Sequence, residues 1–228
     1  QGNLANDDGG GLRFLMSGNY PFNVYNNVIV NNVSTHMGGG VSINDAPDVR
    51  VYNNTIMKNI TTATAMTSDG LAAPAGLSAN AGLDPLLFAN IFWDNRAGTW
   101  TGEGVAGIGL EGDLSTIFHR DVGVVGGTGT LNPTFSLLQV PSGADDSTNL
   151  VGEEPLVAQE FDLTVRVFPW RGAPNFIGTD IVAVDVPPDL MGDYHLTAGS
   201  PAINIIPRAD TTVSLNQDYD GQPRPSQS

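Results

Sequence analysis

The sequence contains no cysteine. This absence excludes a disulfide framework, thiol catalysis and zinc or iron–sulfur sites that are built on cysteine. Histidine is also scarce, because the chain has only His36, His119 and His195. These three residues are scattered along the sequence, so we do not expect a histidine-rich metal site.

Positive charge is scarce as well. Nine Lys and Arg stand against 24 Asp and Glu, which gives a formal net charge of −15, and Lys58 is the single lysine. Such a chain repels a phosphate backbone, so we expect no nucleic acid as a partner. No apolar run approaches the roughly 20 residues that span a bilayer, so we expect no membrane insertion. Cations, neutral glycans and basic protein surfaces remain open as partners.

What the sequence does contain is a repeat. Residues 24–35 read VYNNVIVNNVST and residues 51–62 read VYNNTIMKNITT, an offset of 27 residues with seven identities in twelve positions. A fainter third copy, NIFWDN, covers residues 90–95. Glycine-led strand starts accompany the copies at residues 9–14, at 38–43 and, in a looser version, at 104–108. The common order of these matches indicates an internal structural repeat.

Each repeat predicts two or three short strands separated by tight turns. Apolar residues occur in runs of period two or in short continuous runs bounded by Gly and Asn, and Pro47 and paired asparagines interrupt any helical pattern. Strands that return to the same place every ~25 residues stack in parallel, which makes the fold an all-β solenoid. The expected ladders are Ile29, Ile56 and Phe92 in the core and Asn27, Asn54 and Asn90 at a turn.

The whole chain, residues 1–228, is predicted to form a single elongated domain. Two loop excursions are expected, near residues 63–87, where small residues interrupt the repeat, and near residues 141–160, which are polar and acidic. Further strands are expected at residues 122–125 and 134–138 and in the apolar runs of residues 163–186.

Two parts of the sequence resemble a known family. The pattern GGGVSI…VRVYNNTIMKN of residues 38–59 resembles the repeat of right-handed parallel β-helix proteins of the pectin-lyase-like type. The C-terminal runs DYHLTAGSPAIN (193–204) and DYDGQPRP (218–225) resemble the last coils of bacterial choice-of-anchor β-helix proteins. The resemblance implies a right-handed parallel β-helix with a closing region at residues 193–225, and an extracellular or cell-surface location in bacteria. It implies little about chemistry.

The chain ends depart from that family pattern. After residues 218–225 the family has a further closing strand, whereas this sequence continues only with Ser226, Gln227 and Ser228. An open end of a solenoid exposes unpaired strand edges and an apolar cross-section. We therefore expect another polypeptide chain to pack against at least one open end.

The carboxylates form no catalytic pattern in the sequence. Asp45 and Asp48 flank a short Ala-Pro turn, for which a turn-forming role is the favoured interpretation. Tyr25 and Tyr52, one repeat apart, are expected to stack on an outer face, where ladder packing or a platform for a polysaccharide would explain them. No catalytic or cofactor-binding residue is assigned.

One segment has the spacing of a calcium loop. Asn216, Asp218 and Asp220 offer oxygen atoms at the first, third and fifth positions, and Gly221 is at the sixth. A turn held by bonds from Asp to the backbone is the alternative interpretation. No other cofactor is expected.

These observations favour a non-catalytic structural or adhesive module of a secreted or cell-surface bacterial protein. The module is expected to belong to a larger assembly or a longer polypeptide. The alternative is a polysaccharide lyase or glycoside hydrolase of the pectin-lyase-like fold, which would gather at least three acidic or basic side chains in one groove.

Overall fold

The computed structural model describes residues 1–109, 116–161, 164–167, 179–182, 192–207, 210, 212–213 and 215–224. This part of the chain is built almost entirely from short β-strands, most of which pair in parallel. In the same residues no helix is long and apolar enough to cross a membrane.

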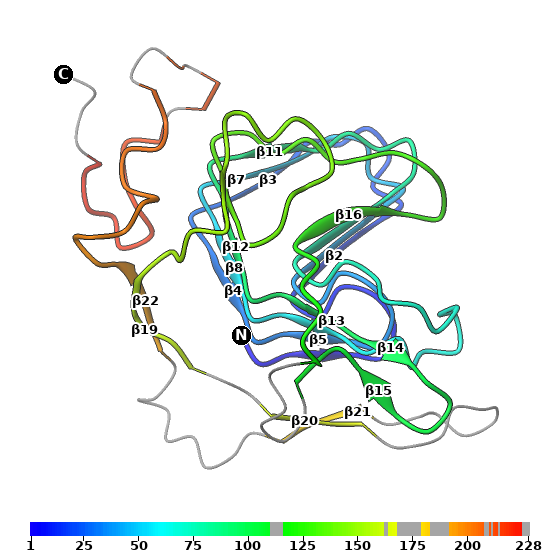
Figure 1. Cartoon of the computed structure of the whole chain (residues 1–228). Helices are drawn as coiled ribbons and strands as arrows, with labels where there is room; N and C mark the ends of the chain where they lie inside the picture. The colour runs from blue at the N-terminus through cyan, green and yellow to red at the C-terminus, as the bar shows by residue number, and fades with distance from the viewer. Residues whose placement is uncertain are drawn as a thin grey trace.

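Four parallel sheets surround one core, and the chain passes through them in the same order several times (Figure 1). We call each passage a coil. Sheet A contains β1 (Leu4–Ala5), β5 (Val33–Ser34), β9 (Ile60–Thr61) and β13 (Arg96–Ala97). Sheet B contains β2 (Leu12–Leu15), β6 (Val41–Asn44), β10 (Leu77–Asn80) and β16 (Val122–Val125).

The other two sheets complete the wall of the core. Sheet C contains β3 (Phe22–Tyr25), β7 (Val49–Tyr52) and β11 (Leu86–Phe88). Sheet D contains β4 (Val28–Val30), β8 (Thr55–Met57), β12 (Ile91–Trp93), β17 (Leu137–Leu138) and β18 (Leu150–Val151). The expected all-β class with stacked parallel sheets is therefore confirmed, and the arrangement is compatible with a parallel β-helix.

Three antiparallel pairs lie outside these sheets. They are β14 (Thr99–Trp100) with β15 (Val105–Ala106), β19 (Val157–Gln159) with β22 (Asp193–Leu196), and β20 (Thr164–Val167) with β21 (Thr179–Val182). The last pair falls in the apolar runs where strands were expected, and the rest of residues 163–186 lies outside the described residues.

The register inside the stack agrees with the repeat. Ile29 is paired with Ile56 and Ile56 with Phe92, and all three side chains belong to the main core cluster. Since a slip of one residue would turn each of these side chains to the other face of its sheet, the predicted register is confirmed.

The predicted amide ladder is also present. Asn27 Nδ2 donates to Asn54 Oδ1 over 3.1 Å, and Asn54 Nδ2 donates to Asn90 Oδ1 over 3.1 Å. Ser136 takes the next position, because its hydroxyl oxygen accepts a hydrogen bond from the backbone N–H of Asn90. The ladder satisfies buried polar groups at the turn between sheets C and D.

A second ladder follows one turn later, between sheets D and A. Asn32 donates to Asn59, and Asn59 donates to Asn95, each over 3.0 Å between Nδ2 and Oδ1. Asn95 Nδ2 then donates to Oδ1 of the buried Asp121, also over 3.0 Å. The last member of this ladder is therefore a carboxyl group.

The structure corrects three of the sequence-based expectations. Residues 63–87 are not one loop, because β10 lies inside this range, β11 begins in it, and both strands pair with the preceding coil. Residues 141–160 likewise contain β18 and β19. The third glycine-led strand start is at Gly76, whose carbonyl oxygen accepts from Val41 N–H, whereas Val105 and Ala106 form the antiparallel strand β15. The inserted residues after β9 lengthen the spacing of the repeat from 27 to 36 residues, which hid this copy.

Candidate functional site: a groove beside the C-terminal segment

The turn between sheets C and D presents a column of outward-facing residues. Asn26, Asn53, Ala89 and Phe135 occupy equivalent places in successive coils, and each has a positive φ between 47° and 55°. Asparagine tolerates this left-handed conformation better than most residues do, which explains the first two members. The residue after each member of this column belongs to the ladder of Asn27, Asn54, Asn90 and Ser136, so the hydrogen bonds of the ladder hold the column in place.

The C-terminal segment, which the structure describes at residues 192–207 and 215–224, runs outside sheet D, next to this column (Figure 1). The side chain of Tyr194, which is 5% exposed, packs with Val30, Met57, Ile91 and Leu137 from the outer face of the sheet. The antiparallel pair of β19 and β22 is thereby fixed to the stack by an apolar contact.

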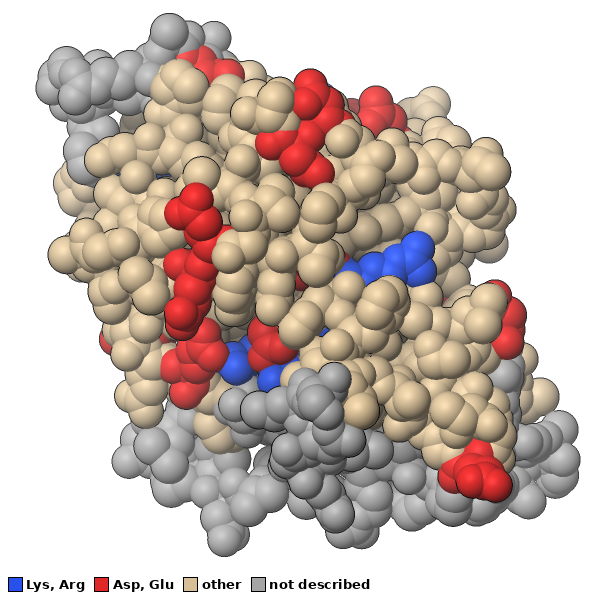
Figure 2. Space-filling view, in the orientation of Figure 1, with Lys and Arg blue, Asp and Glu red and all other residues tan. Residues whose placement is uncertain are grey.

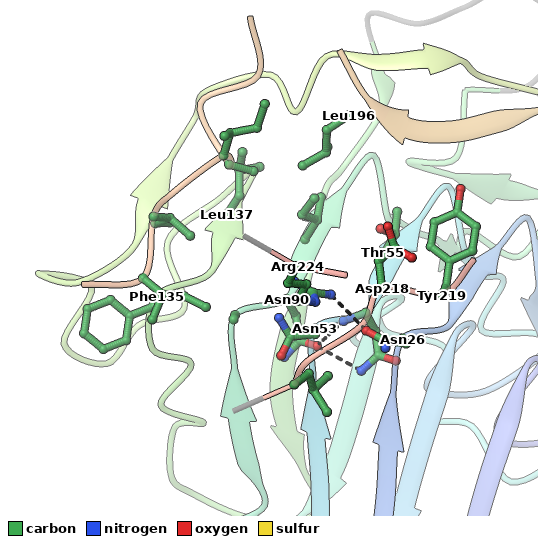
Figure 3. A pocket seen from close by; sticks show the side chains of 18 of the residues that line it. Asn26, Asn53, Thr55, Asn90, Phe135, Leu137, Leu196, Asp218, Tyr219 and Arg224 are labelled. Carbon is green, nitrogen blue, oxygen red and sulfur yellow. Dashed lines mark hydrogen bonds between the residues drawn. The ribbon is translucent and has the colours of Figure 1, made fainter. Parts of the chain in front are cut away.

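A groove of about 1040 Å³ lies between the column and the C-terminal segment (Figure 3). Its stack side includes Asn26, Asn53, Asn90 and Phe135, and its other side includes residues 202–207, 215–216 and 218–219. The lining therefore combines amides, an aromatic ring and apolar side chains, a mixture that suits a ligand with both hydroxyl groups and apolar faces.

Arg224 closes one part of the groove. Its Nη2 donates to Asn26 Oδ1 over 2.9 Å, and its Nε donates to the carbonyl oxygen of Gln217 over 3.2 Å. Asn26 Nδ2 also donates to that carbonyl oxygen over 2.9 Å. Three polar groups thus tie the end of the C-terminal segment to the first coil.

A histidine lies between two carboxylates at the rim. His195 Nδ1 contacts Asp193 Oδ1, and His195 Nε2 contacts Asp220 Oδ2 and, over 2.8 Å, the hydroxyl oxygen of Tyr219. The hydrogen bonds to Asp220 and Asp193 raise the pKa of His195. Burial and the charges of the nearby aspartates raise the pKa of Tyr219 to about 12. The imidazole is therefore biased toward its protonated form and the phenol stays neutral, so this cluster is poorly suited to general-base catalysis near neutral pH.

The three residues of the predicted calcium loop, Asn216, Asp218 and Asp220, each contact a different partner. Asp218 Oδ1 accepts hydrogen bonds from the backbone N–H groups of Asp220 and Gln222, over 3.0 and 2.8 Å. Asp220 turns to His195, and the backbone carbonyl oxygen of Asn216 accepts from Arg224. The contacts of Asp218 agree with the alternative turn interpretation, and calcium binding by Asn216, Asp218 and Asp220 stays a prediction.

A partly buried ionic cluster beside the end of β19 is absent from the sequence-based predictions. Asp94 contacts Arg96 over 2.6 Å, His119 over 3.1 Å and Lys58 over 3.2 Å, and Lys58 contacts Glu160 over 2.7 Å. Burial alone would raise the pKa of Asp94, but the hydrogen bonds from His119 and Arg96 and the charges of Arg96 and Lys58 outweigh burial and lower it. These charges are mutually satisfied, which favours a structural role.

Lys58 and Asp94 lie at equivalent turn positions of neighbouring coils, and both have a positive φ. When residues 90–95 are aligned with the repeat, Asp94 falls opposite Lys58. The repeat therefore predicts that these two side chains are neighbours. The pairing of Lys58 with Glu160 has no signal in the repeat.

The remaining candidate residues lie on the surface. Asp45 is exposed at a positive φ of 52°, and Asp48 contacts Arg50 over 3.2 Å. Tyr25 and Tyr52 stack as expected, with ring centroids 5.2 Å apart and planes 8° from parallel. Acidic side chains are spread over several places on the face shown in Figure 2, whereas basic ones show at only a few.

Comparison of the chain with protein-family models, with curated proteins and with solved structures found no match.

Proposed function

We propose that the chain is a right-handed parallel β-helix of the pectin-lyase-like type that acts as a non-catalytic structural or adhesive module of a secreted or cell-surface bacterial protein. In this proposal the open edge of the first coil joins a second polypeptide chain. The stacked sheets support the β-helix, and right-handed crossover between parallel strands is the general rule. The observation that supports a partner chain is the exposed apolar surface of the first coil.

The first coil is the edge of all four parallel sheets. Strands β1, β2, β3 and β4 each pair with the second coil on one side and pair with no strand on the other side in the described residues, and β21 lies close to β1. Seven of the thirteen exposed large hydrophobic residues of the described chain lie within residues 4–25. They are Leu4, Leu12, Leu15, Met16, Tyr20, Phe22 and Tyr25.

The opposite end of the stack has a different character. Leu131, Leu137 and Leu138 are at most 1% exposed there, and the segment that contains Leu131 packs on the main core. The exposed apolar side chains are thus concentrated at one end. An edge that combines unpaired backbone groups with exposed apolar residues is the kind of surface on which a further strand-forming chain adds.

Light scattering of the purified chain tests this proposal. We expect concentration-dependent association, because the edge accepts strands from a second copy when no other partner is present. Leu15→Lys and Tyr20→Lys, at positions 44% and 75% exposed, should shift the chain toward monomer. Met66→Lys and Leu71→Lys, at positions 59% and 63% exposed outside the first coil, are the matched controls. A stable monomer at all concentrations, or an equal effect of the control variants, would contradict the proposed edge.

The groove supports a second candidate function, which is binding of a neutral polysaccharide. Its volume, amide-rich wall and aromatic residues are the specific observation in favour. A glycan array with the wild-type chain and Tyr219→Ala tests it, with Tyr20→Ala as the control for an exposed tyrosine outside the groove. Loss of binding in Tyr219→Ala alone supports the groove, and product analysis of bound glycans shows whether the chain also cleaves them.

A further inference from the structure

Two aspartates and a histidine meet at the turn that joins sheets A and B. Asp7 and Asp8 follow β1 in the first coil, and His36 follows β5 in the second. One potential ligand atom from each of these residues lies within 4.8 Å of the other two. Asp7 and His36 both stand two residues before a glycine triplet, so the repeat itself places them next to each other.

The backbone holds this pair in register. The N–H group of His36 donates to the carbonyl oxygen of Asp7 over 3.1 Å, and the N–H group of Gly9 donates to the carbonyl oxygen of Met37 over 3.0 Å. The hydroxyl group of Thr67 adds a hydrogen bond to Asp7 Oδ1 over 2.6 Å. The three side chains are therefore positioned by the stack.

The two oxygen atoms of each carboxylate face different partners. Arg13 contacts the Oδ2 atoms, over 3.5 Å at Asp7 and 3.0 Å at Asp8. His36 Nδ1 faces the Oδ1 atoms, over 3.7 Å at Asp7 and 2.8 Å at Asp8. Arg13 thus orients both carboxylates and leaves the Oδ1 atoms directed toward the imidazole.

A buried atom in this cluster has no donor. The side chain of Asp8 is only 4% exposed, and its Oδ1 has no hydrogen-bond partner. His36 Nδ1 is also buried without a hydrogen bond, although the two atoms are 2.8 Å apart. The ring nitrogen is close to the oxygen but is not aligned with it as a donor, and a buried acceptor without a partner is unfavourable.

We propose that Asp7, Asp8 and His36 bind a divalent transition-metal ion through Oδ1, Oδ1 and Nδ1. Imidazole nitrogen together with carboxylate oxygen suits ions such as Zn²⁺, Co²⁺ and Mn²⁺. Two ligand atoms that are each about 2.1 Å from an ion and at right angles to each other are about 3 Å apart, close to the separation of Asp8 Oδ1 and His36 Nδ1. In that arrangement the lone pair of the imidazole points at the ion and not at the carboxylate, which explains the misaligned contact.

The local charge favours a cation. The two aspartates and Arg13 leave a formal charge of −1, so a divalent ion is attracted to the cluster. The ion would join the first coil to the second at the turn, and Thr67 would tie the segment after β9 to the same point. Its structural role is to fix the coil that carries the exposed edge.

NMR of the imidazole nitrogens tests this site directly, because the chain has only three histidines. The chain is treated with a chelator and then titrated with Zn²⁺. We expect the signals of His36 to shift and to reach their end point at one equivalent, while those of His119 and His195 stay in place. We also expect Zn²⁺ to raise the melting temperature.

Two variants and a control decide between a site and general attraction to an acidic surface. Asp8→Asn and His36→Gln should weaken Zn²⁺ binding about tenfold or more and remove the rise in melting temperature. His36 is 20% exposed, so His36→Gln keeps the test valid if the buried Asp8→Asn variant does not fold. Asp45→Asn, at an exposed carboxylate outside the cluster, should bind as the wild type does. The proposal is overturned if the His36 signals do not move in excess Zn²⁺, or if His36→Gln retains wild-type affinity.

Discussion

Asn59 donates a hydrogen bond from Nδ2 to Oδ1 of Asn95, and the two atoms are 3.0 Å apart across neighbouring coils. The same Nδ2 donates to the carbonyl oxygen of Ile29 over 2.9 Å, and Asn59 Oδ1 accepts from the backbone and side chain of Asn32. Asn59 is 0% exposed, so no water helps to satisfy its amide. All of its hydrogen bonds are made to groups on its own coil's two neighbours. The asparagine ladders are thus the most demanding polar feature of the stack.

Asn59→Asp should therefore destabilise the fold strongly. The substitution keeps the shape but replaces the two side-chain N–H donors by an acceptor, which removes the hydrogen bond to Ile29 O and leaves Asn95 Oδ1 with the backbone N–H of Asn59 and a nearby carboxylate oxygen. We expect the free energy of unfolding near neutral pH to fall by about 3 kcal/mol or more, as measured by chemical denaturation. Asn53→Asp, in the half-buried outer column, is the control and should change stability by less than about 0.5 kcal/mol. Equal effects of the two substitutions would contradict the role of the ladder.

The ladders also show what the sequence could predict. The repeat of 27 residues was sufficient to place Asn27 beside Asn54 and Ile29 beside Ile56, because stacking in parallel turns a sequence offset into a spatial neighbour. It failed at β10 and β11, where the inserted residues after β9 changed the spacing and small residues replaced the apolar pattern. Local patterns carry no information on such an insertion.

The candidate sites were less accessible to sequence reasoning. The groove depends on the way in which residues 202–207 and 215–224 lie beside the first four coils, and no local pattern encodes that contact. The cluster of Asp7, Asp8 and His36 differs from the expectation of no histidine-rich metal site, because His36 is far from both aspartates along the sequence and only the stacking of coils brings them together. Asp7 and His36 stand at the same distance from their glycine triplets, and this equivalence is the sequence signal for their proximity.

The second prediction concerns acid stability and Asp94. Its pKa is lower in the folded chain than the ordinary value of about 3.9, because the contacts with His119, Arg96 and Lys58 outweigh the effect of burial. A lowered pKa contributes stability above the ordinary value, and this contribution is lost as the pH falls through the folded pKa. We expect the free energy of unfolding to decrease below about pH 4 and expect Asp94→Asn to remove part of that decrease.

Denaturant unfolding at a series of acidic pH values checks this prediction. Asp48→Asn is the matched control, because Asp48 forms an exposed pair with Arg50. Surface pairs of this kind contribute little, so the control should retain the acid dependence of the wild type. An Asp94→Asn variant with the full acid dependence would show that the ionic cluster does not carry it.

The third prediction has the opposite sign and concerns Asp121. Burial raises the pKa of Asp121 to about 6, although hydrogen bonds from Asn95, Val140 and Gln139 act in the other direction. A raised pKa contributes stability that is complete below the ordinary value and is lost as the pH rises through the folded pKa. We expect this residue to lower the free energy of unfolding by roughly 2–3 kcal/mol between about pH 4 and about pH 6.

Asp121→Asn should remove this dependence, since an amide does not titrate. The variant will be less stable at low pH, because an Nδ2 at this place cannot accept the hydrogen bonds that Oδ2 of the carboxyl group accepts from the N–H groups of Gln139 and Val140. The decisive quantity is the slope of stability against pH between about 4 and 6. A slope that is identical in the wild type and in Asp121→Asn would show that the group titrates in its ordinary range.

The last prediction concerns the close approach of coils at the glycine triplets. A Cβ atom at Gly40 would lie 2.6 Å from the carbonyl oxygen of Gly76 and 3.0 Å from Cγ2 of Ile56. The backbone there is held on both sides, because Gly40 N–H donates to Ala75 and the carbonyl oxygen of Gly40 accepts from Leu12. The obstacle to a side chain is therefore packing against a fixed neighbour.

Gly40→Ala should lower the free energy of unfolding by about 1–3 kcal/mol, the range for overpacking in a dense core. Gly104→Ala is the matched control, since a Cβ atom there would meet nothing within 4 Å. The control should be neutral or slightly stabilising, because alanine reduces the freedom of the unfolded chain. Parallel denaturation curves of the two variants measure the difference. If Gly40→Ala is as stable as Gly104→Ala, the coils can separate to admit a methyl group, and the triplets are not required by the spacing of the stack.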